Sequence, residues 1–223
     1  MKKSILLLAI CALALGACRS LRIRDFHTNE AIPQRLPRLG LLVHERSFLD
    51  AFFADIDRDV LLLSNGDGPY IPSPWEVYQR TDLTLSDVFQ VLENDLQDNI
   101  NLSGGEKHGN ARFKLLYYEQ RNAGWGLLFP SIATFGVANL LGMPCIIYRV
   151  DVELQMEITD VHGTVLNRYS APGSGKGKVA AYHGYGVYPA LRKANLVAVQ
   201  DALSSIKTKM TADIPALTEQ LSK

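Results

Sequence analysis

The sequence predicts an α+β fold, in which an antiparallel or mixed sheet carries helices packed on one face and ends in a long C-terminal helix. Residues 148–159 alternate apolar and polar side chains, which is the pattern of a strand with one buried and one solvated face. Residues 86–100 and 189–210 instead repeat apolar residues every three or four positions, as amphipathic helices do. A hydrophobic content of 47% and a charged content of 21% are typical of a globular protein with a core.

The N-terminus has the three parts of a secretory signal peptide. Residues 1–3 are a short basic start, and residues 4–15 are an uncharged, mostly apolar run. This run is too short to cross a hydrocarbon core of ~30 Å as a permanent helix. Leu15, Gly16, Ala17 and Cys18 then close the segment with small residues before a cysteine.

Residues 15–18 resemble the lipobox of bacterial lipoproteins, a likeness that implies a signal peptide at 1–17 and lipidation of Cys18. Two or more acyl chains on this cysteine would anchor the chain to a membrane without a spanning helix. In that family an aspartate after the cysteine marks inner-membrane retention, so Arg19 implies the outer membrane. No acidic run follows Cys18, which implies the periplasmic face. An ordinary secreted protein and an uncleaved anchor are the alternatives.

Residues 18–38 are expected to be a lipidated tether. The stretch is polar and basic and is interrupted by Pro33 and Pro37, so we predict an extended chain without core residues. Residues 39–223 are then expected to form a single α+β domain.

The first half of this domain is predicted to contain short elements. Residues 39–44 are an apolar run and the expected first strand, and residues 47–56 have the spacing of a short amphipathic helix. Residues 60–63 could be another strand, followed by a dense cluster of turn formers. Pro72 and Pro74 are expected to keep the chain irregular as far as Trp75.

The helix over 86–100 is the best helix signal of the first half. Thr84 or Ser86 is expected to cap its N-terminus, because a hydroxyl oxygen there can accept a free backbone N–H. The glycines after Ser103 should end it, and residues 112–120 should form the next strand.

The second half is predicted to hold a long hairpin. The 148–159 strand should turn at residues 160–163, where Gly163 can adopt a positive φ, and return as a strand over 164–170. A glycine-rich loop over 173–186 should lead to the long helix.

That long helix, over 189–210, is expected to be followed by a short one. Pro189 suits the first helical turn, because a helix leaves the N–H of that position without a partner in any case. Residues 214–221 are predicted to form the short final helix.

Residues 122–148 contain no charged side chain. Pro130, Pro144 and several glycines argue against one continuous membrane-spanning helix. A segment that is hydrophobic all round must be buried in the fold, in a partner or against lipid. We therefore expect this segment to contact another subunit or the bilayer surface, through Ser131, Ile132, Phe135, Leu140 and Leu141.

A second candidate contact is the stretch in which glycines separate tyrosines. Tyrosines on a glycine-rich backbone present large amphipathic surfaces, a composition common in binding loops. The alternative, weighed about equally, is a loop folded back over the sheet with its rings half buried. The residues of this candidate are Tyr182, Tyr185 and Tyr188.

The sequence offers no catalytic, metal or cofactor motif. The run from Gly173 to Lys178 lacks the Ser or Thr that a phosphate-binding loop needs after its lysine. The five histidines have no zinc spacing. Asp55, Asp57 and Asp59 alternate as in calcium loops but lack the glycine and the distal glutamate. A formal net charge of +0 gives no electrostatic case for nucleic acid.

The order of predicted elements over 83–210 resembles envelope lipoproteins with a TolB-N-terminal-like domain, such as the curli-secretion lipoprotein. We expect a non-enzymatic outer-membrane lipoprotein, an accessory or assembly component that binds other envelope proteins and could form a homo-oligomer. The alternative is a subunit of an oligomeric outer-membrane secretion pore, although residues 122–148 lack the alternating polar face of a barrel hairpin. A third hypothesis is an envelope hydrolase whose site is assembled from scattered residues.

Overall fold

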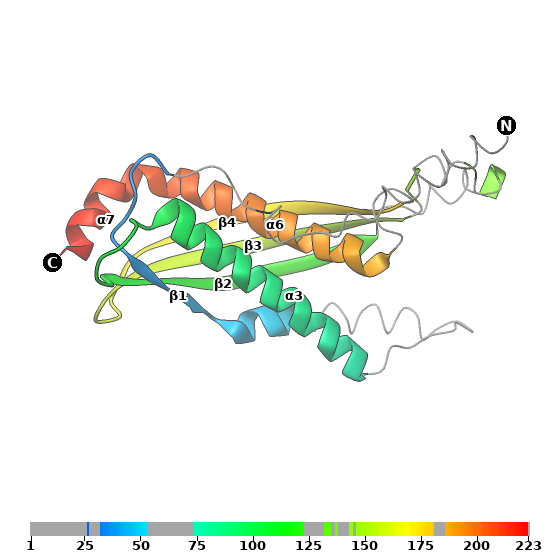
Figure 1. Ribbon diagram of the computed structural model, residues 1–223, viewed down its shortest axis with the longest axis horizontal. Helices are drawn as coiled ribbons and strands as arrows, with labels where there is room; N and C mark the ends of the chain where they lie inside the picture. Colours follow the sequence, from blue (N-terminus) through cyan, green and yellow to red (C-terminus); the bar gives the residue numbers. More distant parts are fainter. Residues whose placement is uncertain are drawn as a thin grey trace, which may run out of the picture.

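The computed structural model describes residues 26, 32–52, 74–122, 132–134, 137, 143–144, 146–180 and 186–222, without the side chains of 74–83. Four strands form one mixed sheet in the order β1-β2-β3-β4 (Figure 1). The strand β1 (Leu39–Val43) runs parallel to β2 (Gly109–Asn122), and β3 (Ile146–Asp160) is antiparallel to both β2 and β4 (Val165–Val179).

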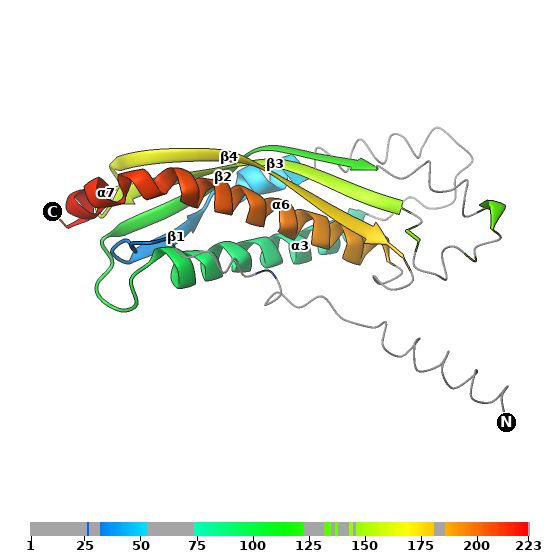
Figure 2. The same cartoon turned by 90° about the horizontal axis from the view of Figure 1, so that it is seen from above.

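The two long helices lie on the same face of this sheet (Figure 2). They are α3 (Pro74–Asp95), which continues into the π-helical turn η2 (Leu96–Ile100), and α6 (Val187–Met210). A 3-10 turn, η4 (Thr211–Asp213), then connects α6 to α7 (Ile214–Leu221). The predicted fold class, an α+β sheet with helices on one face and a long C-terminal helix, is confirmed.

The core lies between this sheet and these helices. From Tyr148 to Ile158, strand β3 follows the predicted period of two, so its inward side chains pack beneath the helices and its outward ones do not. Thr159, expected on the polar face, is instead buried, because the register with β4 shifts between Ile158 and Thr159. The buried residues of this strand that form the core are Tyr148, Val150, Val152, Leu154, Met156 and Ile158. The predicted turn after it is also confirmed, because Gly163 has a φ of 85°.

The expectation of a glycine-rich loop over residues 173–186 is wrong for its first half. Residues 173–179 form the second half of β4 and pair with the first residues of β3. Gly173, Gly175 and Gly177 face α6, where a Cβ on any of them would lie about 2 Å from a helix carbonyl oxygen. The glycines let the helix backbone approach the strand closely, which no larger residue would permit.

Two further expectations about the first half are wrong. Helix α3 begins at Pro74, so this proline starts a helix where we expected irregular chain. Thr84 therefore lies inside the helix and is buried, and neither Thr84 nor Ser86 occupies an N-cap position. Residues 45–52 are helical, as the 47–56 pattern predicts, while residues 53–56 and the predicted strand at 60–63 lie outside the described residues.

The predicted tether also contributes to the core. Phe26, Ile32 and Leu36 are buried with the apolar residues of the domain. The backbone N–H of Leu36 donates to the carbonyl oxygen of Ile100 at 2.9 Å, and its carbonyl accepts from the N–H of Leu102 at 2.8 Å. The expectation that residues 18–38 carry no core residue is wrong, because single apolar side chains spaced along a polar stretch are enough to fasten it to the domain.

Candidate functional site: the open face of the sheet

The face of the sheet opposite α3 and α6 is not covered by any helix in the part of the chain that the structure describes (Figure 2). Its side chains come from alternate positions of β2, β3 and β4, and the strand register arranges them in rows across the sheet. We call this surface the open face. Its central strand contributes Arg149, Asp151, Glu153, Gln155 and Glu157.

A β-bulge in β2 determines which of its residues reach the open face. The register with β3 shifts between Leu115 and Tyr117, so Leu116 is an extra residue. Leu115 is buried at 4% exposure, whereas Leu116 and Tyr117 are both exposed, at 44% and 47%. A strict period of two would instead have placed Tyr117 beside Leu115, inside the core.

The residue after the bulge returns to the helix side. The hydroxyl of Tyr118 donates to Oδ1 of Asn195 on α6 at 3.0 Å, and its ring lies 4.5 Å from that of Phe52. The bulge therefore gives the core one tyrosine and the open face the other.

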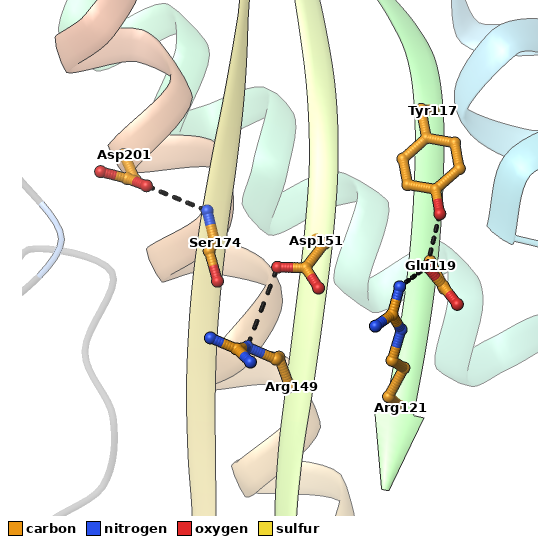
Figure 3. A network of polar contacts seen from close by, with 7 residues as sticks. All are labelled: Tyr117, Glu119, Arg121, Arg149, Asp151, Ser174 and Asp201. Atoms are coloured by element: carbon orange, nitrogen blue, oxygen red, sulfur yellow. Dashed lines mark hydrogen bonds and ion pairs between the residues drawn. The ribbon is translucent and has the colours of Figure 1, made fainter. Parts of the chain in front are cut away.

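Tyr117 begins a chain of polar contacts on the open face (Figure 3). Its hydroxyl donates to Oε2 of Glu119, which also accepts from the guanidinium of Arg121. The hydrogen bond to Glu119 is the largest cause of a raised pKa of Tyr117, and the same carboxylate raises the pKa of Arg121. These three side chains hold one another in a defined orientation on an exposed surface.

The neighbouring strand β3 places a second pair of charged side chains beside Glu119 and Arg121. Nε of Arg149 lies 4.0 Å from Oδ1 of Asp151, one row closer to the centre of the sheet (Figure 3). The register places Glu119 beside Asp151 and Asp151 beside Ser174. An acidic row thus lies next to a row that starts with Arg121.

A second set of ion pairs lies at the other end of the open face. Glu157 forms ion pairs with both neighbouring strands: its Oε2 lies 3.8 Å from Nη1 of Arg112, and its Oε1 lies 3.0 Å from Nε of Arg168. Gln155 also donates to Oε1 of this carboxylate, at 3.2 Å. The cross-strand pairs stabilise the register, each by roughly 0.2–1 kcal/mol.

The outer edge of β4 is closed to a further strand over residues 170–174. Pro172 has no N–H to donate, and the N–H of Ser174 donates to Oδ2 of Asp201 on α6 at 3.0 Å (Figure 3). Nζ of Lys209 donates to the carbonyl oxygen of Ser170 at 2.5 Å. The helix side chains therefore occupy backbone groups with which an added strand would pair.

The open face combines charged side chains with exposed apolar ones. The open face has interspersed positive and negative side chains around two exposed larger ones, Leu116 and Tyr117, and aromatic residues such as tyrosine are enriched at protein–protein interfaces. Among the described residues there is no cluster of three His, Cys, Asp or Glu side chains able to hold a metal ion. None of the described helices is long and apolar enough to cross a bilayer.

Two of the residues predicted from the sequence to make contacts are described. Ile132 is 73% exposed, and Tyr188 lies half-buried in the first turn of α6. The lipidation site Cys18 and the predicted contact residues Ser131, Phe135, Leu140, Leu141, Tyr182 and Tyr185 lie outside the described residues. The rows of the open face were missed, although the polar positions of the β3 repeat were a signal for the central strand.

No family model and no curated protein matches this sequence. Among solved structures, a "putative lipoprotein" from Caulobacter crescentus is similar to the chain with a TM-score of 0.28 and 11% identity. The similarity covers 66% of this chain and 83% of that chain. A likeness at this TM-score supports no conclusion about the fold or the function of this protein.

Proposed function

We propose that the protein is a non-enzymatic lipoprotein of the outer membrane that faces the periplasm and binds other envelope proteins through the open face. The observation that carries the binding role is the exposed pair Leu116 and Tyr117 between rows of ion-paired side chains. The feature that supports the location is the resemblance of residues 15–18 to a bacterial lipobox.

The location is tested through the cysteine. Cys18→Ala removes the thiol that would carry lipid, so we expect the variant to lose acylation and membrane retention, measured by metabolic labelling with a fatty acid and by cell fractionation. Cys145→Ala is the matched control and should keep both. Acylation and retention in the Cys18 variant would refute the anchor.

The binding role is tested by site-specific photo-cross-linking in intact cells. A photoreactive phenylalanine in place of Tyr117 should give a discrete adduct with an envelope protein, because this position lies at the centre of the open face. The same amino acid in place of Lys193, which is exposed on α6, is the control.

The adduct should disappear when Glu119→Lys reverses the charge beside Tyr117. An adduct that forms equally well at position 193, or that survives this charge reversal, would show that the open face does not select the partner.

The apolar segment 122–148 is the second proposed contact, with another subunit or with lipid. It motivates the alternative function, a subunit of an oligomeric secretion pore. An edge-to-edge ring through β4 is opposed by the contacts of Asp201 and Lys209 with the edge of that strand. The exposed apolar side chain of Ile132 favours a contact made by the segment itself.

Leu140→Asp with Leu141→Asp tests this contact through the cost of burying charge. We expect a folded protein with unchanged melting temperature that has lost its oligomer or its partner, measured by size-exclusion mass after detergent extraction. Val161→Asp with Val165→Asp, at exposed positions in and beside the hairpin turn, is the control. If the Leu140 variant does not fold, the segment is ordinary core.

A further inference from the structure

Cations form a row across the open face at one end of the sheet. Arg121 of β2 pairs in register with Arg149 of β3, and Arg149 pairs with Lys176 of β4. Lys178 lies two residues further along the same edge strand and is also exposed. We call these four residues the cation row. Like charges directly opposite one another destabilise a sheet, so the arrangement has a cost for folding.

The nearby carboxylates balance only part of this charge. Glu119 pairs with Arg121, and Asp151 lies 4.0 Å from Arg149. Lys176 and Lys178 form no ion pair within the part of the chain that the structure describes. This end of the open face is therefore locally positive, although the whole chain has a formal net charge of +0.

The same end of the sheet connects to the uncharged apolar sequence. Strand β2 ends at Asn122, one residue after Arg121, and β3 begins at Ile146, three residues before Arg149. No residue between Asn122 and Ile146 carries a charge. The described apolar side chains of Ile132 and Val137 are 73% and 54% exposed.

We propose that this end of the sheet rests on the membrane surface and that the cation row binds the phosphate groups of anionic lipids. Lysine and arginine combined with an apolar sequence that adjoins them in the chain are typical of segments at the boundary between headgroups and acyl chains. An acidic protein or a nucleic acid would use the cations but would give no role to the exposed apolar side chains of Ile132 and Val137. The proposal rests on the membrane anchor of the proposed function, since the anchor keeps the domain beside a bilayer.

The test uses the full-length protein reconstituted into vesicles and an uncharged amine-acetylating reagent. Acetylation of each lysine is followed by mass spectrometry in vesicles of phosphatidylcholine alone and in vesicles that also contain phosphatidylglycerol. We expect the acetylation rates of Lys176 and Lys178 to fall about fivefold in the anionic vesicles. Lys114 on the open face and Lys193 on α6 are internal controls that should react at equal rates in both.

Two double variants test whether the cation row causes the protection of Lys176 and Lys178 from acetylation. Arg121→Gln with Arg149→Gln should abolish the anionic-lipid protection of the two lysines, while Arg112→Gln with Arg168→Gln, at the other end of the open face, should preserve it. Circular dichroism melting verifies that both variants fold. If the first pair fails to fold, the wild-type comparison alone decides the proposal.

Equal acetylation of Lys176 and Lys178 in the two kinds of vesicle would overturn the proposal. Protection that appears in intact envelopes but not in anionic vesicles would also overturn it and would assign the row to an acidic protein. A protein that fails to float with any vesicle after extraction would instead indicate a missing lipid anchor, which is a failure of the proposed function.

Discussion

A Cβ atom added to Gly175 would lie 1.9 Å from the carbonyl oxygen of Ala194. The same close approach repeats along the strand, because two strand residues advance about 6.8 Å and four helix residues about 6.0 Å. Glycines at every second position of β4 therefore meet alanines at every fourth position of α6. The alanines of this contact are Ala190, Ala194, Ala198 and Ala202.

Gly175→Ala should destabilise the protein. The added methyl group would push against the backbone of α6, which cannot move away as a flexible side chain can, so we expect a loss of ~1–3 kcal/mol in the free energy of unfolding. Urea unfolding followed by circular dichroism measures it. Lys176→Ala, on the opposite face of the same strand, should stay within ~0.5 kcal/mol, and equal losses for both variants would contradict the close packing.

Lys207 and Asp95 form a buried ion pair between α6 and α3. Nζ of Lys207 lies 2.8 Å from Oδ1 of Asp95, and the two side chains are only 4% exposed each. Asn99 also donates to Oδ1 of this carboxylate, at 2.6 Å. Removing either of these buried charges would leave the other unpaired away from water, which is strongly destabilising.

Lys207→Met should therefore destabilise the fold by ~3–5 kcal/mol, because it leaves the carboxylate of Asp95 buried without its cation. Asp95→Asn in the same chain should recover most of this loss, since the neutral amide still accepts from Asn99. Thermal unfolding of the two variants beside the wild type measures both effects. A double variant no more stable than the single one would show that charge burial is not the cause.

Asp201→Ala should free the edge of β4. The N–H of Ser174 would lose its acceptor, at a cost of ~1 kcal/mol, and would exchange with solvent faster. Hydrogen–deuterium exchange at Ser174 measures the change. Asp201→Asn keeps an acceptor oxygen and should exchange more slowly than the alanine variant, so equal rates in the two variants would contradict the role of this contact.

Asp160 should make the hairpin turn sensitive to acid. Desolvation by itself would raise the pKa of Asp160, but hydrogen bonds from the N–H groups of Thr164, at 2.7 Å, and His162, at 2.9 Å, outweigh it and lower the pKa. A lowered pKa means that the ionised group stabilises the turn above its ordinary pKa of ~3.9 and that this contribution is lost as pH falls through the folded value.

The amide proton shift of Thr164 should report this titration below pH ~3.9 in the wild type. Asp160→Asn should abolish the pH dependence while the turn persists at neutral pH. A Thr164 shift that titrates at or above the ordinary aspartate pKa would contradict the lowered value.

Local patterns in the sequence predicted most of the elements. The strict alternation around Leu154 predicted β3 and its buried face, and the apolar repeat around Leu203 predicted α6. These predictions succeeded because apolar residues recur every second position in a half-buried strand and every three or four positions in an amphipathic helix. The order of these elements was then sufficient for the α+β class.

Other features depended on residues far apart in the chain. The sequence around Gly175 predicted a loop, since glycines favour turns. In the structure, Gly175 lies in a strand and packs against the backbone of Ala194. Leu36 was predicted to lie in a tether, but its backbone N–H bonds to the carbonyl oxygen of Ile100. Tyr117 reads as a core residue until the bulge turns it outward.

The sequence by itself determined most of the elements and the fold class, because helix and strand periods are local properties. The resemblance of residues 15–18 to a lipobox is also local, and it remains a prediction. The tertiary structure decided that Arg121, Arg149 and Lys176 share one row and that Asp201 reaches the edge of β4. Cross-strand neighbours depend on register, and register is set by the bulge and by packing against the helices. The open face therefore becomes visible only when the strands are paired.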